Sequence, residues 1–335
     1  IGGIEHAILH LLYSRFWWKV MRDIGLVYGD EPFKRLLTQG MVLNEIFFRK
    51  PASGRVIYYN PAEVETRTDD KGNRLGAVLK HDGEPVESGG VGTMSKSKNN
   101  GVDPQSLIEQ YGADTARLFM MFAAPPEMTL EWSEEGVAGA SRFLRRLWRL
   151  VAEHVNQGAM TESDFSSLSP MLKDLRRQAH QTLAKATDDI GRRRTFNTAI
   201  ASVMELLNSV SRLEDNSAPA RAVRQEALEF AVLTLSPIVP HVCHSLWRAL
   251  GHEEAVIDAR WPKPDDAALK QDSLEIVVQV NGKLRGRVTV PAGASDEETA
   301  GYALADANIQ RFVEGKELKK KIVVPGKLVN IVVAG

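Results

Sequence analysis

The sequence contains a single cysteine, Cys243, among its 335 residues. One cysteine cannot form an intrachain disulfide, and it cannot supply the several thiolates of a cysteine zinc site. A lone cysteine suits a reducing compartment, so we expect a cytoplasmic protein. The chain also has no run of about 20 apolar residues, the length needed to cross a bilayer, and we therefore expect no membrane partner.

An excess of charge of either sign is absent as well. The chain has 42 lysines and arginines against 43 acidic residues, a formal net charge of −1. A polyanion site must therefore come from local clusters of basic residues. The composition is that of a globular protein, and the length predicts two or three domains. The chain starts without methionine or a signal peptide, and helical apolar spacing begins at once. We expect a fragment of a longer protein.

The first 90 residues predict an α/β unit. Helical spacing over 4–24, a short helix over 31–39 and an apolar strand over 40–48 follow in an order typical of such sheets. Turn-forming pairs and short β-rich runs over 50–90 predict a small β-rich insertion with exposed hairpins. We expect the aromatic residues 16–18 to lie in the core.

Helices dominate the middle of the chain. Asp103 is predicted to cap a helix that starts at Pro104 and ends at Gly112, and a second, apolar helix covers 113–123. Longer helical patterns then predict a bundle, with Pro237 and Pro240 interrupting its last member. These patterns cover 135–157, 168–190, 195–214 and 219–250.

The tail from 274 to 335 has a different pattern, and a linker rich in proline and aspartate precedes it at 261–273. Asn281-Gly282 predicts a tight type I′ hairpin turn, because both residues accept a positive φ. A helix over 295–313 and a second hairpin at Pro325-Gly326 complete a predicted ββαββ domain.

The polar loop at 91–102 contains the first candidate site. Lys96 and Lys98 are flanked by serines and glycines and stand directly before the capped helix. Ammonium groups, hydroxyls and backbone N–H groups of such a loop could surround a triphosphate. A solvated surface loop is the simpler interpretation on composition alone. The glycine spacing is not that of a P-loop.

The run Thr93-Met94-Ser95-Lys96-Ser97 resembles the KMSKS signature of class I aminoacyl-tRNA synthetases, with Thr93 in place of the first lysine. The continuation over 98–104 resembles the leucine, isoleucine and valine group. The resemblance implies an ATP site in which Lys96 and Lys98 hold the leaving pyrophosphate. Met94, Ser95 and Ser97 would line that site.

Further runs over 2–13, 39–43 and 111–123, together with Glu131-Trp132, resemble the leucyl-tRNA synthetases of bacterial type. An isoleucyl enzyme would be expected to end in a cysteine zinc site, which one cysteine cannot form. The resemblance implies a multidomain chain that begins at the end of a Rossmann-like α/β catalytic core. Its six expected parts are the core end (1–49), a leucine-specific β-rich insertion (50–90), the signature loop and following helices (91–134), an all-α tRNA-binding bundle of the anticodon-binding type (135–260), the linker (261–273) and a C-terminal α+β tRNA-binding domain (274–335).

The same resemblance implies an adenylate pocket at the start of the chain. Gly2, Gly3, Glu5 and His6 would hold the ribose and adenine, and Gln39 would support the adenylate. His10 would lie near the leucine side chain, although a core histidine is an equal alternative. His6 and His10 have the i, i+4 spacing of a metal pair. We expect no metal site there, because the sequence lacks an obvious third ligand.

Clusters of basic residues are the candidate tRNA contacts, because phosphates bind arginine and lysine. A solvated helix or sheet face is the alternative interpretation. In the tail hairpin, period-2 alternation places the basic residues on one face and Leu284 with apolar residues on the other. The candidates are Arg142, Arg145, Arg146, Arg149, Arg192, Arg193, Lys283, Arg285 and Arg287.

The resemblance implies leucine activation with ATP and Mg²⁺ and transfer to tRNA(Leu), by a full enzyme that is a monomer. The sequence has no HIGH-type His-x-Gly-His run and no editing domain, which normally precede these segments. The chain alone is therefore expected to be inactive without the missing N-terminal half. One alternative is a non-catalytic tRNA-binding module or a subunit of a split synthetase, and another is a basic scaffold unrelated to tRNA.

Overall fold

The structure is a computed structural model that describes residues 2–52, 54–71, 73–158, 165–270 and 273–334. The chain divides into two compact units, Ile1–Pro264 and Asp265–Gly335. The predicted linker overlaps this boundary and contains the short helix α9 (Asp266–Leu269). Its residues 271 and 272 lie outside the described part. None of the helices in that part is both long and apolar enough to cross a membrane.

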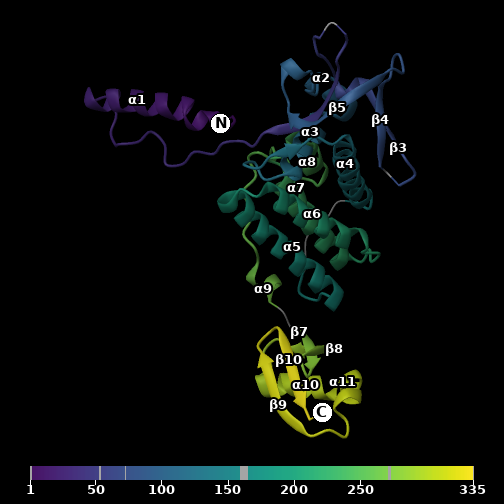
Figure 1. The fold of residues 1–335 in the computed structure, drawn as a ribbon. Coiled ribbons are helices and arrows are strands. Elements are labelled where there is room, and N and C mark those ends of the chain that lie inside the picture. Colours follow the sequence, from purple (N-terminus) through teal and green to yellow (C-terminus); the bar gives the residue numbers. More distant parts are fainter. Residues whose placement is uncertain (1, 53, 72, 159–164, 271–272, 335) are drawn as a thin grey trace. The chain divides into compact units, whose positions relative to one another are not determined.

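A mixed sheet organises the start of the N-terminal unit (Figure 1). The predicted strand at 40–48 is confirmed as β1, and the β-rich character of 50–90 is confirmed by the strands that follow. β1 pairs in parallel with β6 and in antiparallel fashion with β2 and β5. The strand order is β2-β1-β5-β4-β3. The strands are β1 (Val42–Arg49), β2 (Ile57–Tyr59), β3 (Val64–Thr68), β4 (Arg74–Leu79), β5 (Pro85–Thr93) and β6 (Leu130–Glu131).

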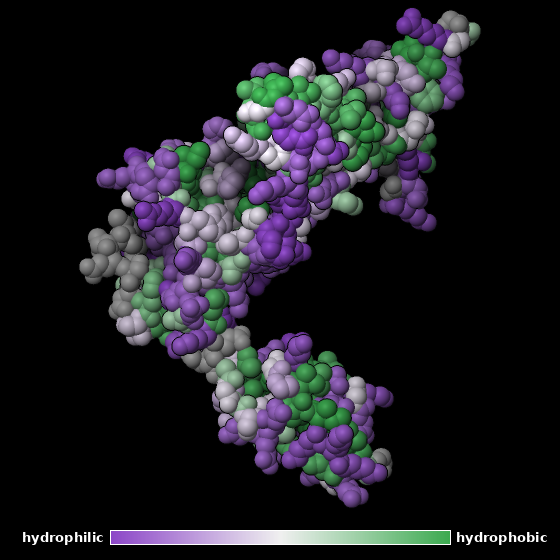
Figure 2. All heavy atoms as spheres, turned by 90° about the vertical axis from the view of Figure 1, so that its left-hand side faces the viewer, coloured by the Kyte–Doolittle hydropathy of each residue, from purple (hydrophilic) through white to green (hydrophobic). Residues whose placement is uncertain are grey.

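The N-terminal helical region departs from its prediction. The single helix expected over 4–24 is a 3-10 turn, η1 (Ile4–Ala7), followed by α1 (Leu9–Asp23). No residue of α1 is buried, and Phe16 and Trp17 are each 58% exposed, so their predicted place in the core is wrong. Figure 2, which views the side on which α1 lies in Figure 1, shows hydrophobic atoms exposed on that face.

The short helix predicted over 31–39 is also wrong, because this segment is extended and irregular. A helix of two to three turns gains too few hydrogen bonds to offset the cost of its nucleation unless it packs against a core. Side-chain contacts with the helical region hold the segment instead. Glu31 pairs with Arg15 at 2.6 Å, and Phe33 stacks on His10.

Two helices connect the sheet to the bundle. The predicted cap is confirmed: the Asp103 carboxylate accepts hydrogen bonds from the backbone of Gln105 and Ser106 at the start of α2 (Pro104–Tyr111). α3 (Ala113–Ala123) follows at Gly112 and is bonded to the bundle. The Asp114 carboxylate accepts from the Val242 N–H at 2.7 Å, and Arg117 donates to the Ile238 carbonyl at 2.7 Å. The helices after the loop are thereby anchored to the bundle.

The predicted helical bundle is confirmed (Figure 1), and one continuous apolar core of buried side chains joins its helices to α3. The interruption predicted at Pro237 and Pro240 separates α7 from α8. The bundle consists of α4 (Glu134–Val155), α5 (Pro170–Asp188), the π-helical turn η4 (Asp189–Arg193), α6 (Phe196–Ser211), α7 (Ala218–Leu235) and α8 (Pro240–Ala249).

The C-terminal unit is a four-stranded sheet of order β8-β7-β10-β9, with two helices packed on it. Asn281 and Gly282 have φ values of 50° and 76°, which confirms the type I′ signal. The single helix predicted over 295–313 is wrong. Asp306 is extended, ends α10 (Asp296–Ala305) and caps α11 (Ala307–Val313). The strands are β7 (Ser273–Val280), β8 (Lys283–Pro291), β9 (Leu318–Val324) and β10 (Leu328–Val333).

Candidate functional site

The loop that contains the two candidate lysines begins where β5 ends. The Met94 N–H donates to the Val42 carbonyl of β1 at 3.0 Å. Ser95 is extended, and its hydroxyl accepts from the Lys98 N–H at 3.3 Å, which caps the 3-10 turn η3 (Lys96–Lys98). Asn99 ends the turn in the left-handed region with φ 49°. The sequence between Ser95 and Asn99 therefore folds as a defined turn with both lysines inside it.

The two lysines differ in their surroundings. Lys96 and Ser97 are exposed, and no described residue forms an ion pair with Lys96. Lys98 is half-buried, and its Nζ lies 3.8 Å from the position that a Cβ at Gly92 would occupy. The Lys98 side chain therefore folds back over β5 at Gly92. One ammonium group faces solvent and the other lies against the sheet.

A buried asparagine, Asn100, closes the base of the loop. Its side chain is fully buried, and its Oδ1 accepts from the Ser95 N–H at 2.8 Å. Its Nδ2 faces the carbonyls of Asn44, Gly92 and Thr93 at 3.3–3.4 Å. Asn100 was not predicted to be a functional residue. The only signal was an asparagine three residues after the signature run 93–97, and its burial could not be anticipated in a polar loop.

The predicted adenylate residues lie close to one another at the start of the chain. The Gln39 N–H donates to the Gly2 carbonyl at 2.9 Å. The His6 ring would meet a Cβ at Gly2 at 3.1 Å, and the Glu5 carboxylate would overlap a Cβ at Gly3. The two glycines therefore allow both side chains to fold over the backbone.

His10 lies at the edge of this group, where its ring meets the His6 ring edge-on. It is exposed, so the alternative of a core histidine is wrong. Its ring stacks on Phe33 with centroids 5.9 Å apart, and it lies 6.5 Å from the His6 ring. Within the described residues, no group of three or more histidines, cysteines or acidic residues could hold a metal ion.

A short backbone segment connects the two groups of candidate residues. Gln39 bonds to Gly2, and Val42, three residues later, accepts from Met94. Three extended residues span at most about 11 Å. A Cβ at Gly40 would overlap the Met128 carbonyl, so glycine lets this segment lie directly against the chain before β6. The N-terminal residues and the start of the signature loop are thus neighbours.

The predicted tRNA-contacting cations fall into two groups. Several already have partners within the protein: Arg146 donates to Asn208 at 2.8 Å, and Arg285 lies over the Phe312 ring at 4.3 Å. Acidic side chains pair with Arg149, Arg192, Arg193 and Arg287. Among the described residues, the exposed candidates whose side chains form no hydrogen bond or ion pair are Arg142, Arg145 and Lys283.

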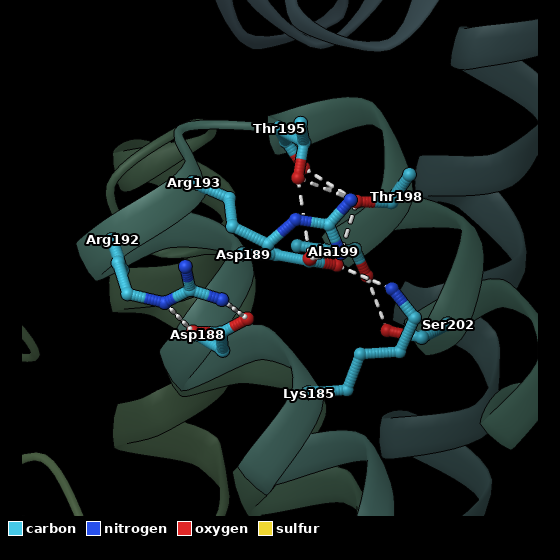
Figure 3. A network of polar contacts seen from close by, with 9 residues as sticks. All are labelled: Lys185, Asp188, Asp189, Arg192, Arg193, Thr195, Thr198, Ala199 and Ser202. Carbon is cyan, nitrogen blue, oxygen red and sulfur yellow. Dashed lines mark hydrogen bonds and ion pairs between the residues drawn. The ribbon is translucent and has the colours of Figure 1, made fainter.

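Asp189, the partner of Arg193, lies at the centre of the polar contacts drawn in Figure 3. The Asp189 side chain is 1% exposed, and it accepts from Lys185, from Arg193 at 3.1 Å and from Thr198 at 2.6 Å. Burial raises the pKa of Asp189, but hydrogen bonds from Lys185, Thr198 and Thr195, together with the positive charge of Lys185, outweigh burial and hold the pKa below its ordinary value. The carboxylate is therefore charged at neutral pH and fixes the turn between α5 and α6.

Comparisons with known sequence families match the helical bundle and the segment that contains the signature loop. Residues 173–300 match the sequence family described as the anticodon-binding domain of tRNA ligase. Residues 86–133, which include the signature loop, match the family described as tRNA synthetases class I (I, L, M and V). The fold and the loop thus define the chain as part of a class I aminoacyl-tRNA synthetase.

Whole-chain relatives narrow this class. The chain is 62% identical to the leucine–tRNA ligase of Nitrosospira multiformis and 61% identical to that of Marinobacter nauticus, with 99% of the chain covered in each case. The LeuRS–tRNA–LeuAMS ternary complex of Agrobacterium radiobacter matches 99% of the chain with a TM-score of 0.72 and 27% identity. The chain belongs to the leucyl-tRNA synthetase family. It spans 38–39% of the length of these relatives.

Proposed function

We propose that the chain supplies one part of the leucyl-adenylate site of a leucyl-tRNA synthetase, together with a surface for tRNA(Leu). The proposal rests on the segment Gln39–Val42, which brings the N-terminal glycine and histidine residues next to the signature loop. A glycine pair that lets side chains fold over the backbone suits a nucleotide, and the loop beside it offers two cations to the phosphates.

The proposed reaction has two steps. The leucine carboxylate attacks the α-phosphate of ATP, which forms leucyl-adenylate and releases pyrophosphate. A ribose hydroxyl at the 3′ end of tRNA then attacks the leucyl carbonyl, which forms the ester and releases AMP. Lys96 and Lys98 would neutralise charge that develops on the pyrophosphate, so catalysis here is positioning and electrostatics. The described residues offer no cluster of acidic ligands for a metal. Mg²⁺ would therefore arrive with the ATP phosphates, which supply oxygen ligands themselves.

The rest of the adenylate site is proposed to come from a segment that corresponds to the part of the longer relatives that this chain does not match. Within the described residues, α1 has an exposed apolar face that includes Leu9, Leu12 and Phe16. An exposed apolar face of this kind marks a contact surface. We propose that it packs against the other part of the catalytic core.

Amino-acid specificity tests the proposal. In a full-length protein that contains this chain, we expect ATP–pyrophosphate exchange to depend on leucine and to be far weaker with isoleucine or valine at equal concentration. Exchange that is independent of the amino acid, or that prefers valine, would exclude the proposed activity.

The salt dependence of tRNA binding tests the proposed RNA surface. Removing one phosphate contact lowers the slope of log K against log salt by about 0.7–0.9. We expect Arg142→Ala with Arg145→Ala to reduce the slope for tRNA(Leu) by between one and two units in a gel-shift titration. Arg192→Ala is the matched control, because Asp188 already pairs with this arginine. A slope that the double variant leaves unchanged would remove these arginines from the interface.

A further inference from the structure

Three asparagines from separate segments meet at the base of the signature loop. Asn44 lies on β1, Asn60 precedes the 3-10 turn η2 (Pro61–Glu63), and Asn100 follows the loop itself. Each donates a side-chain hydrogen bond to a backbone carbonyl at this base, and we call the three residues the asparagine clamp. The clamp joins the loop to two places in the sheet.

Asn100 has the central position in the asparagine clamp. Its Oδ1 accepts from the Ser95 N–H, and its Nδ2 is directed to carbonyls at the end of β5 and on β1. Its own backbone carbonyl accepts from Asn44 Nδ2 at 3.2 Å. Only an amide side chain combines an acceptor and two donors in this way, since aspartate accepts only and alanine does neither.

Asn60 secures the following residue. Its Nδ2 donates to the Gly101 carbonyl at 2.9 Å, while its Oδ1 accepts from the Ala62 N–H at 3.0 Å and caps η2. Asn44 is similarly occupied, because its Oδ1 accepts from the Glu45 N–H at 2.9 Å. Both side chains are therefore fixed before they contact the loop.

These contacts also determine the conformation of the turn that contains the two lysines. Asn100 fixes the Ser95 backbone, and the Ser95 hydroxyl caps the turn that contains Lys96 and Lys98. Exposed side chains such as Lys96 and Ser97 cannot fix the turn by packing. The hydrogen bonds at the buried base are what hold its conformation.

We propose that Asn100 is a positioning residue for adenylate formation, which acts by holding the signature loop in the shape that presents Lys96 and Lys98 to the pyrophosphate. The inference rests on the proposed function. It adds to that function that a buried amide, which is not itself a nucleotide ligand, determines the orientation of both lysines. Electrostatic stabilisation depends on groups held in place before the reaction, so a loosened loop loses rate rather than leucine affinity.

The test uses the full-length synthetase that contains this chain. We expect Asn100→Ala to lower kcat for leucine-dependent ATP–pyrophosphate exchange by about 10-fold or more, the scale of a misplaced charge contact. KM for leucine should stay within about twofold. Transfer of leucine from isolated leucyl-adenylate to tRNA(Leu) should be unchanged, because pyrophosphate has already left. An equal loss in exchange and in transfer would indicate a merely structural role and overturn the inference.

Two further variants guard against misfolding and non-specific effects. Asn60→Asp keeps the cap on η2 but cannot donate to Gly101, and we expect a smaller loss, about 3-fold, in exchange alone. Asn99→Gly is the matched control. Its exposed side chain lies beside Asn100, and glycine readily adopts the same positive φ, so exchange should match the parent. If Asn60→Asp and Asn100→Ala both retain full exchange, the asparagine clamp has no positioning role.

A double-mutant cycle separates this inference from the proposed function. If Asn100 acts through Lys96 and Lys98, adding Asn100→Ala to the double variant Lys96→Ala with Lys98→Ala should slow exchange little further. A loss as large as that of Asn100→Ala alone would contradict action through the two lysines. If Lys96→Ala itself leaves exchange unchanged, the proposed role of the loop fails. If only Asn100→Ala leaves it unchanged, the inference alone fails.

Discussion

Replacing Lys96 with alanine in the full-length synthetase is expected to slow leucine-dependent ATP–pyrophosphate exchange by about 10²-fold or more, the scale of losing one transition-state charge contact. Lys96 is exposed within a capped turn, and no described residue forms an ion pair with it. Its charge is therefore available to a phosphate. Since the contact forms with the leaving group, we expect the loss in kcat rather than in KM for leucine.

The control for this prediction removes an equal charge elsewhere. Lys316 is an exposed lysine of the C-terminal unit. Exchange requires no tRNA, so Lys316→Ala should match the parent protein in this assay. Equal losses in both variants would point to a general effect of charge, and an unchanged rate in Lys96→Ala would contradict the role of the loop.

Replacing Asp189 with alanine is expected to destabilise the helical bundle by about 2–4 kcal/mol, because several charge-assisted hydrogen bonds end on this one buried carboxylate. For a unit of this size we expect a fall in melting temperature of roughly 4–16 °C, measured by calorimetry at neutral pH. The expected loss of stability is moderate because the Lys185 and Arg193 side chains are about half exposed and can be hydrated once the carboxylate is gone.

Asp188, the preceding residue, provides the control. It pairs with Arg192 on the surface, where solvent screens the interaction. Asp188→Ala should leave the melting temperature essentially unchanged, and a comparable fall in both variants would show that the hydrogen bonds of Asp189 are not the cause. The sign of the pH effect follows from the lowered pKa of Asp189. Its stabilisation is present above the pKa of the unfolded state and is lost as pH falls through the lower folded value.

Local patterns predicted most of the elements. The Asp103 cap, the glycine that ends α2, the proline interruption after α7 and the Asn281-Gly282 turn each depend on a few neighbouring residues, and all four are confirmed. Predictions were wrong where the helical propensity of a segment competes with capping or tertiary contacts. Residues 295–313 have continuous helical spacing, yet Asp306 accepts two backbone N–H groups and starts a new helix instead.

Burial was harder to predict than secondary structure. The amphipathic pattern of α1 was correct, but an amphipathic pattern does not say what covers its apolar face. The basic clusters raised a similar problem. Arg142 and Arg193 each belong to a cluster of arginines, and the sequence does not distinguish them. The structure shows that the buried Asp189 carboxylate already pairs with Arg193. The role of Asn100 depends on β1 and β5, whose pairing brings Asn44 to the loop from 56 residues away.

The central claim is that this chain holds the signature-loop part of an ATP site whose other part belongs to the rest of the synthetase. Leucine-dependent ATP–pyrophosphate exchange, measured on the 335-residue chain alone and after addition of the N-terminal part of a relative, tests it most directly. We predict no exchange above background for the chain alone and leucine-dependent exchange once the second part is present. Exchange by the chain alone would contradict the claim.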